Sequence, residues 1–147
     1  MRRTRRSAPI IAGVMTPMTD LQILAWAVAL GLAHLVLSVA FNVAGRGFLY
    51  GIGPRDEPPR QLGVIASRIE RAYRNYIESF PFFAAAVLLG HAANPGKPAL
   101  LVGAQIYLWA RVFYVPAYVA GIPGIRTACW AASIVGVVIV LVGVWLP

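Results

Sequence analysis

One uncharged apolar run near the start of this chain limits what it can fold into. Leu21–Val43 contains no Asp, Glu, Lys or Arg over 23 residues. The hydrocarbon core of a bilayer is about 30 Å thick, and a helix needs about 20 residues to cross it. The run therefore predicts a membrane-spanning helix.

The composition of the whole chain agrees with this prediction. Of its 147 residues, 59% are hydrophobic and 12% are charged. Soluble domains have about 45–50% apolar and about 25% charged residues, and disordered chains have low hydrophobicity, so both classes are excluded. Four crossings would use roughly 80 residues, which leaves short loops and no separate soluble domain.

Turn residues divide the rest of the chain into three further spans. The breaks are Ala44–Gln61, whose glycines and prolines exclude a regular helix through the whole loop, Asn94-Pro95-Gly96, and Gly121–Gly124. The predicted spans cover about 21–43, 71–93, 98–121 and 125–146, with the second helix starting near Gly63. Residues 20–147 thus form one all-α domain, an integral membrane four-helix bundle with short connections.

Residues 1–19 form a basic tail, in which four arginines precede Asp20. Met15 and Met18 lie closer to the first span, and we interpret the first residues as mis-started. The net charge of +8 would indicate a nucleic-acid partner in a soluble chain. Here the arginines lie near helix ends, where they orient membrane helices and meet anionic lipid, so we predict lipid partners and no nucleic acid.

Several residues inside the spans predict local structure. Pro81 is expected to kink the second helix, and His34 is expected to have a hydrogen-bonded packing role. The single cysteine, Cys129, excludes an intrachain disulfide. Small residues allow close helix packing, and the span glycines are Gly31, Gly90, Gly103, Gly136 and Gly143.

The second helix carries four polar residues on one face. Arg71, Arg74, Asn75 and Glu78 lie at positions i, i+3, i+4 and i+7. Because an unpaired carboxylate close to an apolar stretch is costly, we expect Glu78 to be ionised and paired with Arg74 or Arg71. A simpler alternative is that the two arginines only mark a cytoplasmic helix end.

The third helix repeats this pattern. Tyr107, Arg111, Tyr114 and Tyr118 lie at i, i+4, i+7 and i+11, again on one face. A central arginine costs about 2.5–3.5 kcal/mol on insertion scales, so Arg111 should face the bundle interior or a wet cavity. A structural pair of Arg111 with Glu78 is an open alternative.

Other arginines are interpreted more simply, as loop charges or charges that face lipid headgroups. They are Arg55, Arg60 and Arg68.

These side chains favour a small anion with several charges. Arginines bind carboxylates through two parallel hydrogen bonds, and a glutamate can bind an ammonium group. No His/Cys/Asp cluster predicts a metal, and no Ser-His pair predicts acyl transfer. The residues by themselves predict an anion-binding pocket within the membrane.

Three segments resemble one known family. RAYRNYIESFPFF (Arg71–Phe83) is similar to the second-helix signature of the MAPEG family, the membrane-associated proteins in eicosanoid and glutathione metabolism. YLWARVFYVPAYVAGIPGIRTACW (Tyr107–Trp130) and GPRDEPP (Gly53–Pro59) resemble a bacterial branch of that family. The resemblance runs from about residue 20 to the end.

The resemblance implies a homotrimer that binds glutathione between neighbouring subunits and presents its thiolate to a lipophilic electrophile or hydroperoxide. By motif, the residues that would bind glutathione are Arg71, Arg74, Asn75 and Glu78, and those that would line its pocket are Arg111, Tyr114 and Tyr118. Arg46 is the basic residue at the end of the first helix, where many relatives have several that contact glutathione. Arg126 is at the position of the arginine proposed to stabilise the thiolate, with Thr127 as its neighbouring hydroxyl.

Two function classes remain open at this stage. The first is a glutathione S-transferase or peroxidase, because a nearby guanidinium lowers the pKa of a thiol. The second is a non-catalytic membrane subunit or lipid-binding scaffold that works with a membrane-complex partner. The charges leave the orientation open. The basic first loop favours a cytoplasmic position for this face and its site at a bacterial inner membrane, whereas the N-terminal arginines favour the opposite orientation. We favour the first.

Overall fold

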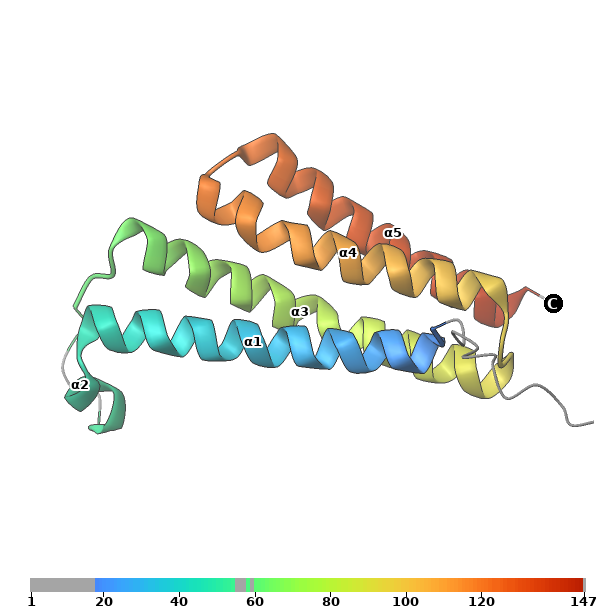
Figure 1. Cartoon of the computed structure of the whole chain (residues 1–147), viewed down its shortest axis with the longest axis horizontal. Coiled ribbons are helices and arrows are strands. Elements are labelled where there is room, and N and C mark those ends of the chain that lie inside the picture. The colour runs from blue at the N-terminus through green and yellow to red at the C-terminus, as the bar shows by residue number, and fades with distance from the viewer. Residues whose placement is uncertain (1–17, 55–57, 59, 147) are drawn as a thin grey trace, which may run out of the picture.

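A computed structural model describes residues 18–54, 58 and 60–146. Within them are four long helices, one short helix and no strand (Figure 1). They are α1 (Asp20–Arg46), α2 (Phe48–Ile52), α3 (Val64–Ala93), α4 (Pro98–Ala120) and α5 (Pro123–Trp145). All four long helices are long and apolar enough to cross a membrane, which confirms the all-α, four-span prediction. Most of the basic tail and the Arg55–Glu57 part of the first-loop motif lie outside the described residues.

Local sequence explains where the helices begin and end. Thr19 Oγ1 accepts a hydrogen bond from the Gln22 amide at 3.2 Å, and Gln22 Oε1 accepts one from the Thr19 amide at 2.9 Å. This capping box starts α1. Both α4 and α5 have proline in the first turn, where its missing N–H costs nothing. Gly121, with φ of 77°, ends α4 in the left-handed conformation that glycine adopts without strain.

The first loop contains more helix than predicted. The helix α1 continues through Gly45 to Arg46, and α2 forms after Gly47, whose φ of 93° breaks the chain direction. The glycines and prolines of Ala44–Gln61 therefore interrupt the helix at single points, and parts of this segment are helical. The side chains of Phe48, Leu49 and Ile52 in α2 are exposed in the subunit. Apolar side chains on a short helix at this end of the bundle are suited to the membrane interface.

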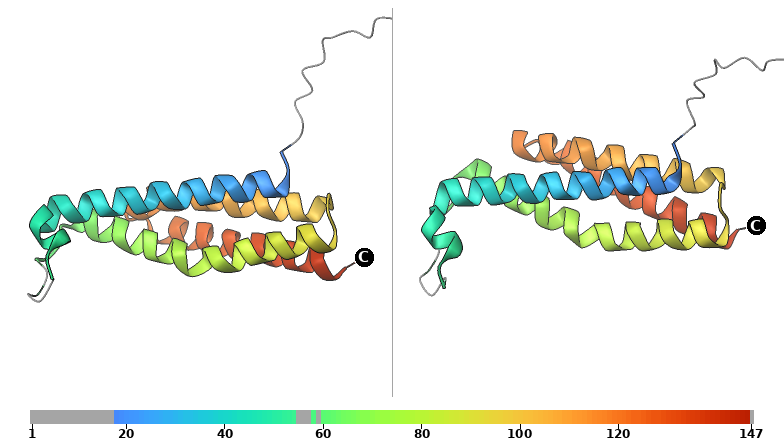
Figure 2. Two further views of the ribbon diagram at one scale, coloured as in Figure 1. Left: turned by 90° about the horizontal axis from the view of Figure 1, so that it is seen from below. Right: turned by 60° about the horizontal axis from the view of Figure 1, so that its bottom comes forward.

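The helices form two layers: α1 lies beside α3, and α4 and α5 form a hairpin against them (Figures 1 and 2). The α4–α5 contact depends on Gly103 and Gly136, because a Cβ on either would lie 2.7 Å from the carbonyl oxygen of the other. A Cβ on Gly31 would lie 2.9 Å from the ring of Tyr76. These contacts confirm the predicted role of the span glycines.

Aromatic rings fill much of the core. Phe83 of α3 and Tyr107 of α4 stack with ring centroids 3.8 Å apart. His34 packs edge-on against Tyr76 at 5.1 Å, but its buried Nδ1 has no hydrogen-bond partner among the described residues. The prediction of packing is thus confirmed for His34, and that of a hydrogen bond is wrong at this nitrogen. The helix α3 contains Pro81 and bends in its middle part (Figure 2).

The bundle has two different ends. We call residues 42–54, 60–74 and 118–127 the loop end, which holds α2 and lies on the left in Figure 1. The turn end comprises residues 18–22, 91–98 and 143–146. At the turn end, Lys97 Nζ donates to the carbonyls of Gly143, at 3.0 Å, and Leu146. The ammonium group of Lys97 therefore binds carbonyls in and just after the last turn of α5, which have no N–H partner within the helix.

Candidate functional site

Arg111 lies in the middle of α4 and faces the interior of the bundle, as predicted. Only 1% of its surface is exposed. Its Nη1 donates to Asn75 Oδ1 and its Nη2 to Ser79 Oγ, both at 2.6 Å. Its guanidinium lies 5.4 Å from the ring centroid of Tyr114. Within the described part of the chain no carboxylate lies within 4.0 Å of it, so the alternative of a pair with Glu78 is not found.

Two further arginines meet at Tyr118 near the end of α4. The guanidinium of Arg126, from α5, lies 4.8 Å from the ring centroid of Tyr118. Arg71 Nε, from α3, donates to the Tyr118 hydroxyl at 3.3 Å. Neither arginine is in an ion pair with another described residue. We call Arg71, Tyr118 and Arg126 the Tyr118 cluster.

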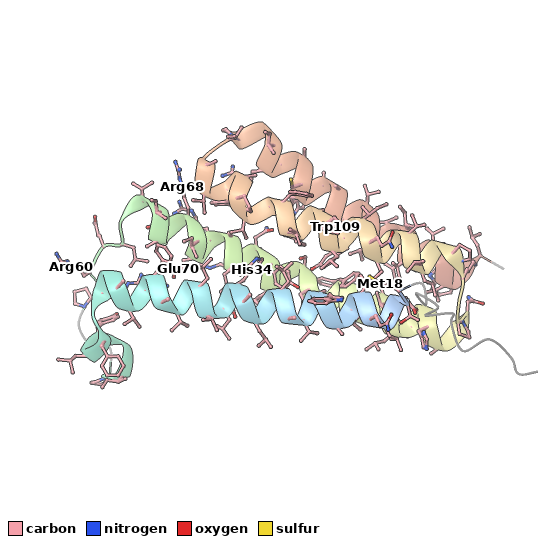
Figure 3. All side chains as sticks on the ribbon, viewed as in Figure 1. Met18, His34, Arg60, Arg68, Glu70 and Trp109 are labelled. Carbon is pink, nitrogen blue, oxygen red and sulfur yellow. The ribbon has the colours of Figure 1, made fainter. Side chains whose placement is uncertain are left out.

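Arg68 does not have the lipid-facing role expected for it. Its Nη1 donates to the carbonyl oxygen of Val119 at 2.7 Å, and its guanidinium lies against Gly121. Figure 3 shows Arg68 between α3 and the end of α4. The last carbonyls of α4 lack helical partners and carry the negative end of the helix dipole, so they attract a cation.

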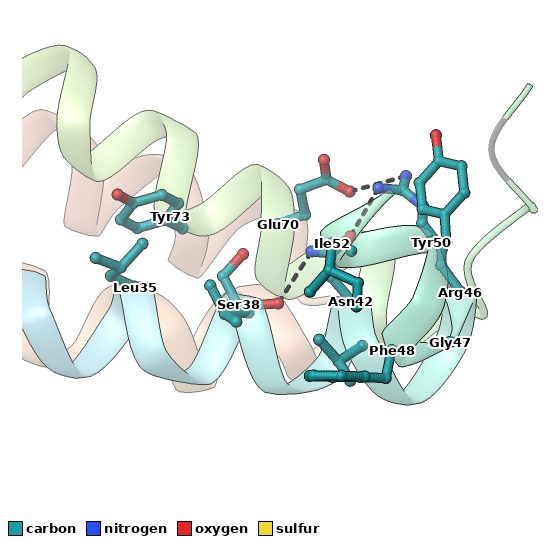
Figure 4. Close-up of a pocket in the computed structure, with 13 residues that line it drawn as sticks. Leu35, Ser38, Asn42, Arg46, Gly47, Phe48, Tyr50, Ile52, Glu70 and Tyr73 are labelled. Atoms are coloured by element: carbon teal, nitrogen blue, oxygen red, sulfur yellow. Dashed lines mark hydrogen bonds and ion pairs between the residues drawn. The ribbon is translucent and has the colours of Figure 1, made fainter. Parts of the chain in front are cut away.

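Glu70 joins two predicted site residues and was not itself predicted. It lies 3.7 Å from Arg46 of α1 (Figure 4). It also lies 3.8 Å from Arg74 on its own helix. Arg46 Nη1 also donates to Asn42 Oδ1 at 2.8 Å. The group of Arg46, Glu70 and Arg74 has a net formal charge of +1 (two cations less one anion), and we call it the α1–α3 charge group. The (i, i+4) spacing of Glu70 and Arg74 was the signal in the sequence.

The predicted pairing of Glu78 with Arg74 or Arg71 is wrong. The carboxylate that Arg74 meets is Glu70, four residues before it rather than four after it. Glu78 is exposed, on a face of α3 that this subunit leaves open. Thr127 is also exposed, and its Oγ1 donates to the Pro123 carbonyl of its own helix at 3.0 Å.

Two pockets meet at the α1–α3 charge group. The first, of about 490 Å³, is mostly polar and includes Arg46, Glu70, Arg71 and Arg74. We call it the basic pocket. Arg71 thus belongs to both this pocket and the Tyr118 cluster. The second pocket, of about 470 Å³, lies between α1, α2 and α3.

Of the predicted site residues, the structure thus joins Asn75, Arg111 and Tyr114 to one another, and Arg71 to Tyr118 and Arg126. The side chains of Tyr114 and Tyr118 lie 5.5 Å apart between ring centroids and connect these two groups. Among the described residues, no three His, Cys, Asp or Glu side chains come together to hold a metal.

Residues 23–146 match the model of the MAPEG family. The chain belongs to the MAPEG family. The matched range includes nearly all of α1 and all of α3, α4 and α5, so membership covers every span. A comparison with curated proteins finds no match. Family membership indicates a membrane protein with a glutathione-related transferase activity or a related function.

Proposed function

We propose that this MAPEG protein is a glutathione-dependent transferase or peroxidase that acts on lipophilic substrates in the membrane. The observation that carries the proposal is the Tyr118 cluster, in which Arg71 and Arg126 approach one ring from two helices without a carboxylate among the described residues. Because two like charges that lie close together repel each other, an anion that binds between the two guanidinium groups is favoured.

Glutathione has the charges that this end of the bundle could bind. Its two carboxylates suit the guanidinium groups of Arg71 and Arg74, which lie in the basic pocket. Its ammonium group suits a carboxylate such as that of Glu78. In a homotrimer, a second subunit would cover the open face of α3 and place Glu78 in a site between subunits.

Arg126 has the role of thiolate stabiliser in this proposal. Its guanidinium is held against the ring of Tyr118, so its charge is preorganised rather than free in solvent. A guanidinium close to the thiol of glutathione favours the deprotonated, nucleophilic form. The sulfur would then bond to an electrophilic carbon and displace its leaving group. Thr127 would contribute its hydroxyl beside this site.

The loop end would face the cytoplasm of a bacterium. Arg46, Arg60 and Arg68 lie at this end, and cytoplasmic loops carry an excess of arginine and lysine. The bound thiol would then be supplied from the compartment in which bacteria make glutathione.

A specific observation also favours the non-catalytic alternative. Arg111 uses its two terminal nitrogens on Asn75 and Ser79 of the same subunit, so this part of the polar face already has a packing role. If the Tyr118 cluster had only such a role, the protein would be a membrane scaffold or a subunit of a larger complex.

Glutathione binding distinguishes the two functions. The purified protein in lipid nanodiscs is titrated with glutathione in a calorimeter, and the ultraviolet absorbance of the thiolate is recorded in parallel. We expect binding with a thiolate signal at neutral pH. S-methylglutathione, which has no ionisable thiol, should bind without that signal. A protein that binds neither ligand at millimolar concentration would be a scaffold.

A further inference from the structure

One carbonyl at the end of α4 cannot be paired by the helix backbone. In a continued helix, the carbonyl of Val119 would accept from the N–H four residues later, but that residue is Pro123, which has no N–H. The turn that ends α4 gives backbone N–H partners to the carbonyls of Ala117 and Tyr118. The Val119 carbonyl is therefore left to a side-chain donor or to water.

Arg68 of α3 is this donor. Its Nη1 lies 2.7 Å from the Val119 carbonyl oxygen (Figure 3). Its guanidinium also fills the space beside Gly121, because a Cβ added there would lie 2.8 Å from both Nη1 and Nη2. Gly121 has a φ of 77°, so both the backbone and the arginine favour glycine here. Arg68 thus joins α3 to the turn between α4 and α5.

This turn leads directly to the proposed thiolate stabiliser. Only Gly121 and Ile122 separate α4 from α5. The N–H of Arg126 donates to the Ile122 carbonyl at 3.2 Å, so the first turn of α5 begins at this turn. The guanidinium of Arg126 lies over the ring of Tyr118, the residue next to Val119. A displacement of the Val119 carbonyl would therefore move Tyr118 and Arg126 together, relative to α3.

The groups proposed to bind the carboxylates of glutathione lie on α3 rather than on the turn. Arg71 and Arg74 line the basic pocket, whereas Arg68 is not among its lining residues. Arg71 also donates to the Tyr118 hydroxyl, but at 3.3 Å, and its guanidinium is assigned to the ligand. Arg68 therefore holds the turn with a group that the ligand does not use.

We propose that Arg68 is a positioning residue, which holds the α4–α5 turn on α3 so that Arg126 stays at the sulfur of a glutathione bound by α3. The inference rests on the proposed function, because it requires Arg126 to act on the thiol. Arg68 itself touches neither glutathione nor its sulfur, and acts through the backbone of α4. A misplacement of about 1 Å at a catalytic group lowers a rate by as much as about 10²-fold, so such a contact matters to the chemistry.

The pH dependence of the reaction tests the proposal. The protein in nanodiscs is saturated with glutathione, and the thiolate absorbance and kcat with a lipophilic electrophile are recorded against pH. Arg68→Met should raise the pH of half-maximal thiolate by about one unit and lower kcat at neutral pH by about tenfold. The KM for glutathione should change less than about twofold, because the groups that bind it remain. Arg60→Met removes a loop-end charge that has no such contact and should leave the pH profile unchanged.

Two glycines separate the position of Arg68 from its charge. Gly121→Ala keeps every arginine but places a Cβ against the Arg68 guanidinium, so it should shift the pH profile in the same direction as Arg68→Met. Gly96→Ala is the matched control, because Gly96 has a similar φ of 80° and nothing lies within 4 Å of its added Cβ. It carries the same backbone strain at the turn end and should leave the pH profile unchanged.

A double-mutant cycle shows whether Arg68 acts through Arg126. In an Arg126→Ala background, Arg68→Met should cause no further change in kcat or in the thiolate signal, because the group that it positions is absent. Independent effects of the two substitutions would overturn the proposal, since Arg68 would then act on the ligand by another route. A raised KM with unchanged kcat in Arg68→Met would also overturn it and would place Arg68 on glutathione itself.

Failure of this inference differs from failure of the proposed function. A wild-type protein that gives no thiolate signal with glutathione would refute the proposed function and the inference with it. A wild type with that signal, together with an Arg68→Met variant that has the same pH profile, would refute the inference alone. An equal shift in Arg60→Met would do so too, because charge rather than position would then be responsible.

Discussion

The polar and charged side chains at the two ends of the bundle differ in their partners. At the turn end, the polar side chains find partners within the subunit: His91 Nδ1 lies 3.1 Å from a carboxylate oxygen of Asp20, and Asn94 Nδ2 donates to the carbonyl of Val144 at 3.1 Å. At the loop end, the Tyr118 cluster leaves Arg71 and Arg126 without a carboxylate in the described structure. The difference teaches that these polar side chains at the turn end join helices, whereas Arg71 and Arg126 at the loop end have no carboxylate partner and are available to a ligand.

We expect the largest effect from substitution of Arg126. Because Arg126 has no carboxylate partner at the loop end, its loss should lower activity without lowering stability. Arg126→Ala and Arg126→Lys should each lower the rate of conjugation by about 10²–10³, the usual cost of removing one preorganised charge-stabilising donor. Lysine should not restore it, because an ammonium group cannot reproduce a guanidinium held against a ring. Steady-state kinetics with a lipophilic electrophile measure the rate, and thermal unfolding in detergent measures stability.

Arg60→Lys is the matched control, because Arg60 is exposed in the first loop and should tolerate either cation. Full activity of Arg126→Lys would remove Arg126 from the role proposed for it.

The next effect concerns Arg111, which is buried between the two ends. Arg111→Lys should lower the free energy of unfolding by about 1.5–3 kcal/mol, because a lysine cannot donate to both Asn75 Oδ1 and Ser79 Oγ as the two guanidinium nitrogens do. Denaturant unfolding in mixed micelles measures this change. Unaltered stability would show that the network has no packing role and would strengthen the assignment of Arg111 to the ligand site.

A smaller effect is expected at the turn end, from Asp20→Asn. Asp20 is buried, but the side chain of His91 is 40% exposed, so solvent weakens the pair, and we expect a loss of about 1 kcal/mol in unfolding free energy. Glutathione affinity should not change. A double-mutant cycle with His91→Gln isolates the pair. A drop in glutathione affinity in Asp20→Asn would show that the two ends are coupled.

The smallest effect is expected for Lys97, whose ammonium group caps α5. Lys97→Met should reduce stability by about 0.3–1 kcal/mol, the usual range for a cation at a helix C-terminus. Lys97→Arg keeps the charge and should lose less. Thermal unfolding of the two variants side by side measures the difference, and equal losses would mean that geometry rather than charge is responsible.

The MAPEG fold was predictable from the sequence, because the bilayer requires long apolar helices whatever their neighbours are. The shared faces of α3 and α4 were predictable for the same reason, since helical spacing alone places Arg71 with Asn75 and Arg111 with Tyr114. The burial of Arg111 followed from the cost of a charge in the middle of a span.

The partners of the charges were less predictable, and Arg74 shows why. Glu70 and Glu78 lie four residues on either side of it, so helical spacing permits either pair. The structure selects Glu70, because α1 passes that side of α3 and brings Arg46 to the same carboxylate. Arg68 is a second case, since its acceptor on Val119 is 51 residues away.

The amino-acid sequence by itself thus determined the number of spans, the turns between them and the side chains that share a helix face. These depend on interactions within about one helical turn and on the solvent, which are the same for every arrangement of the helices. Only the tertiary structure decided that Arg71 and Arg126 meet at Tyr118 and that Arg46 joins Glu70. Those contacts cross between helices, and local spacing carries no information about which helices become neighbours.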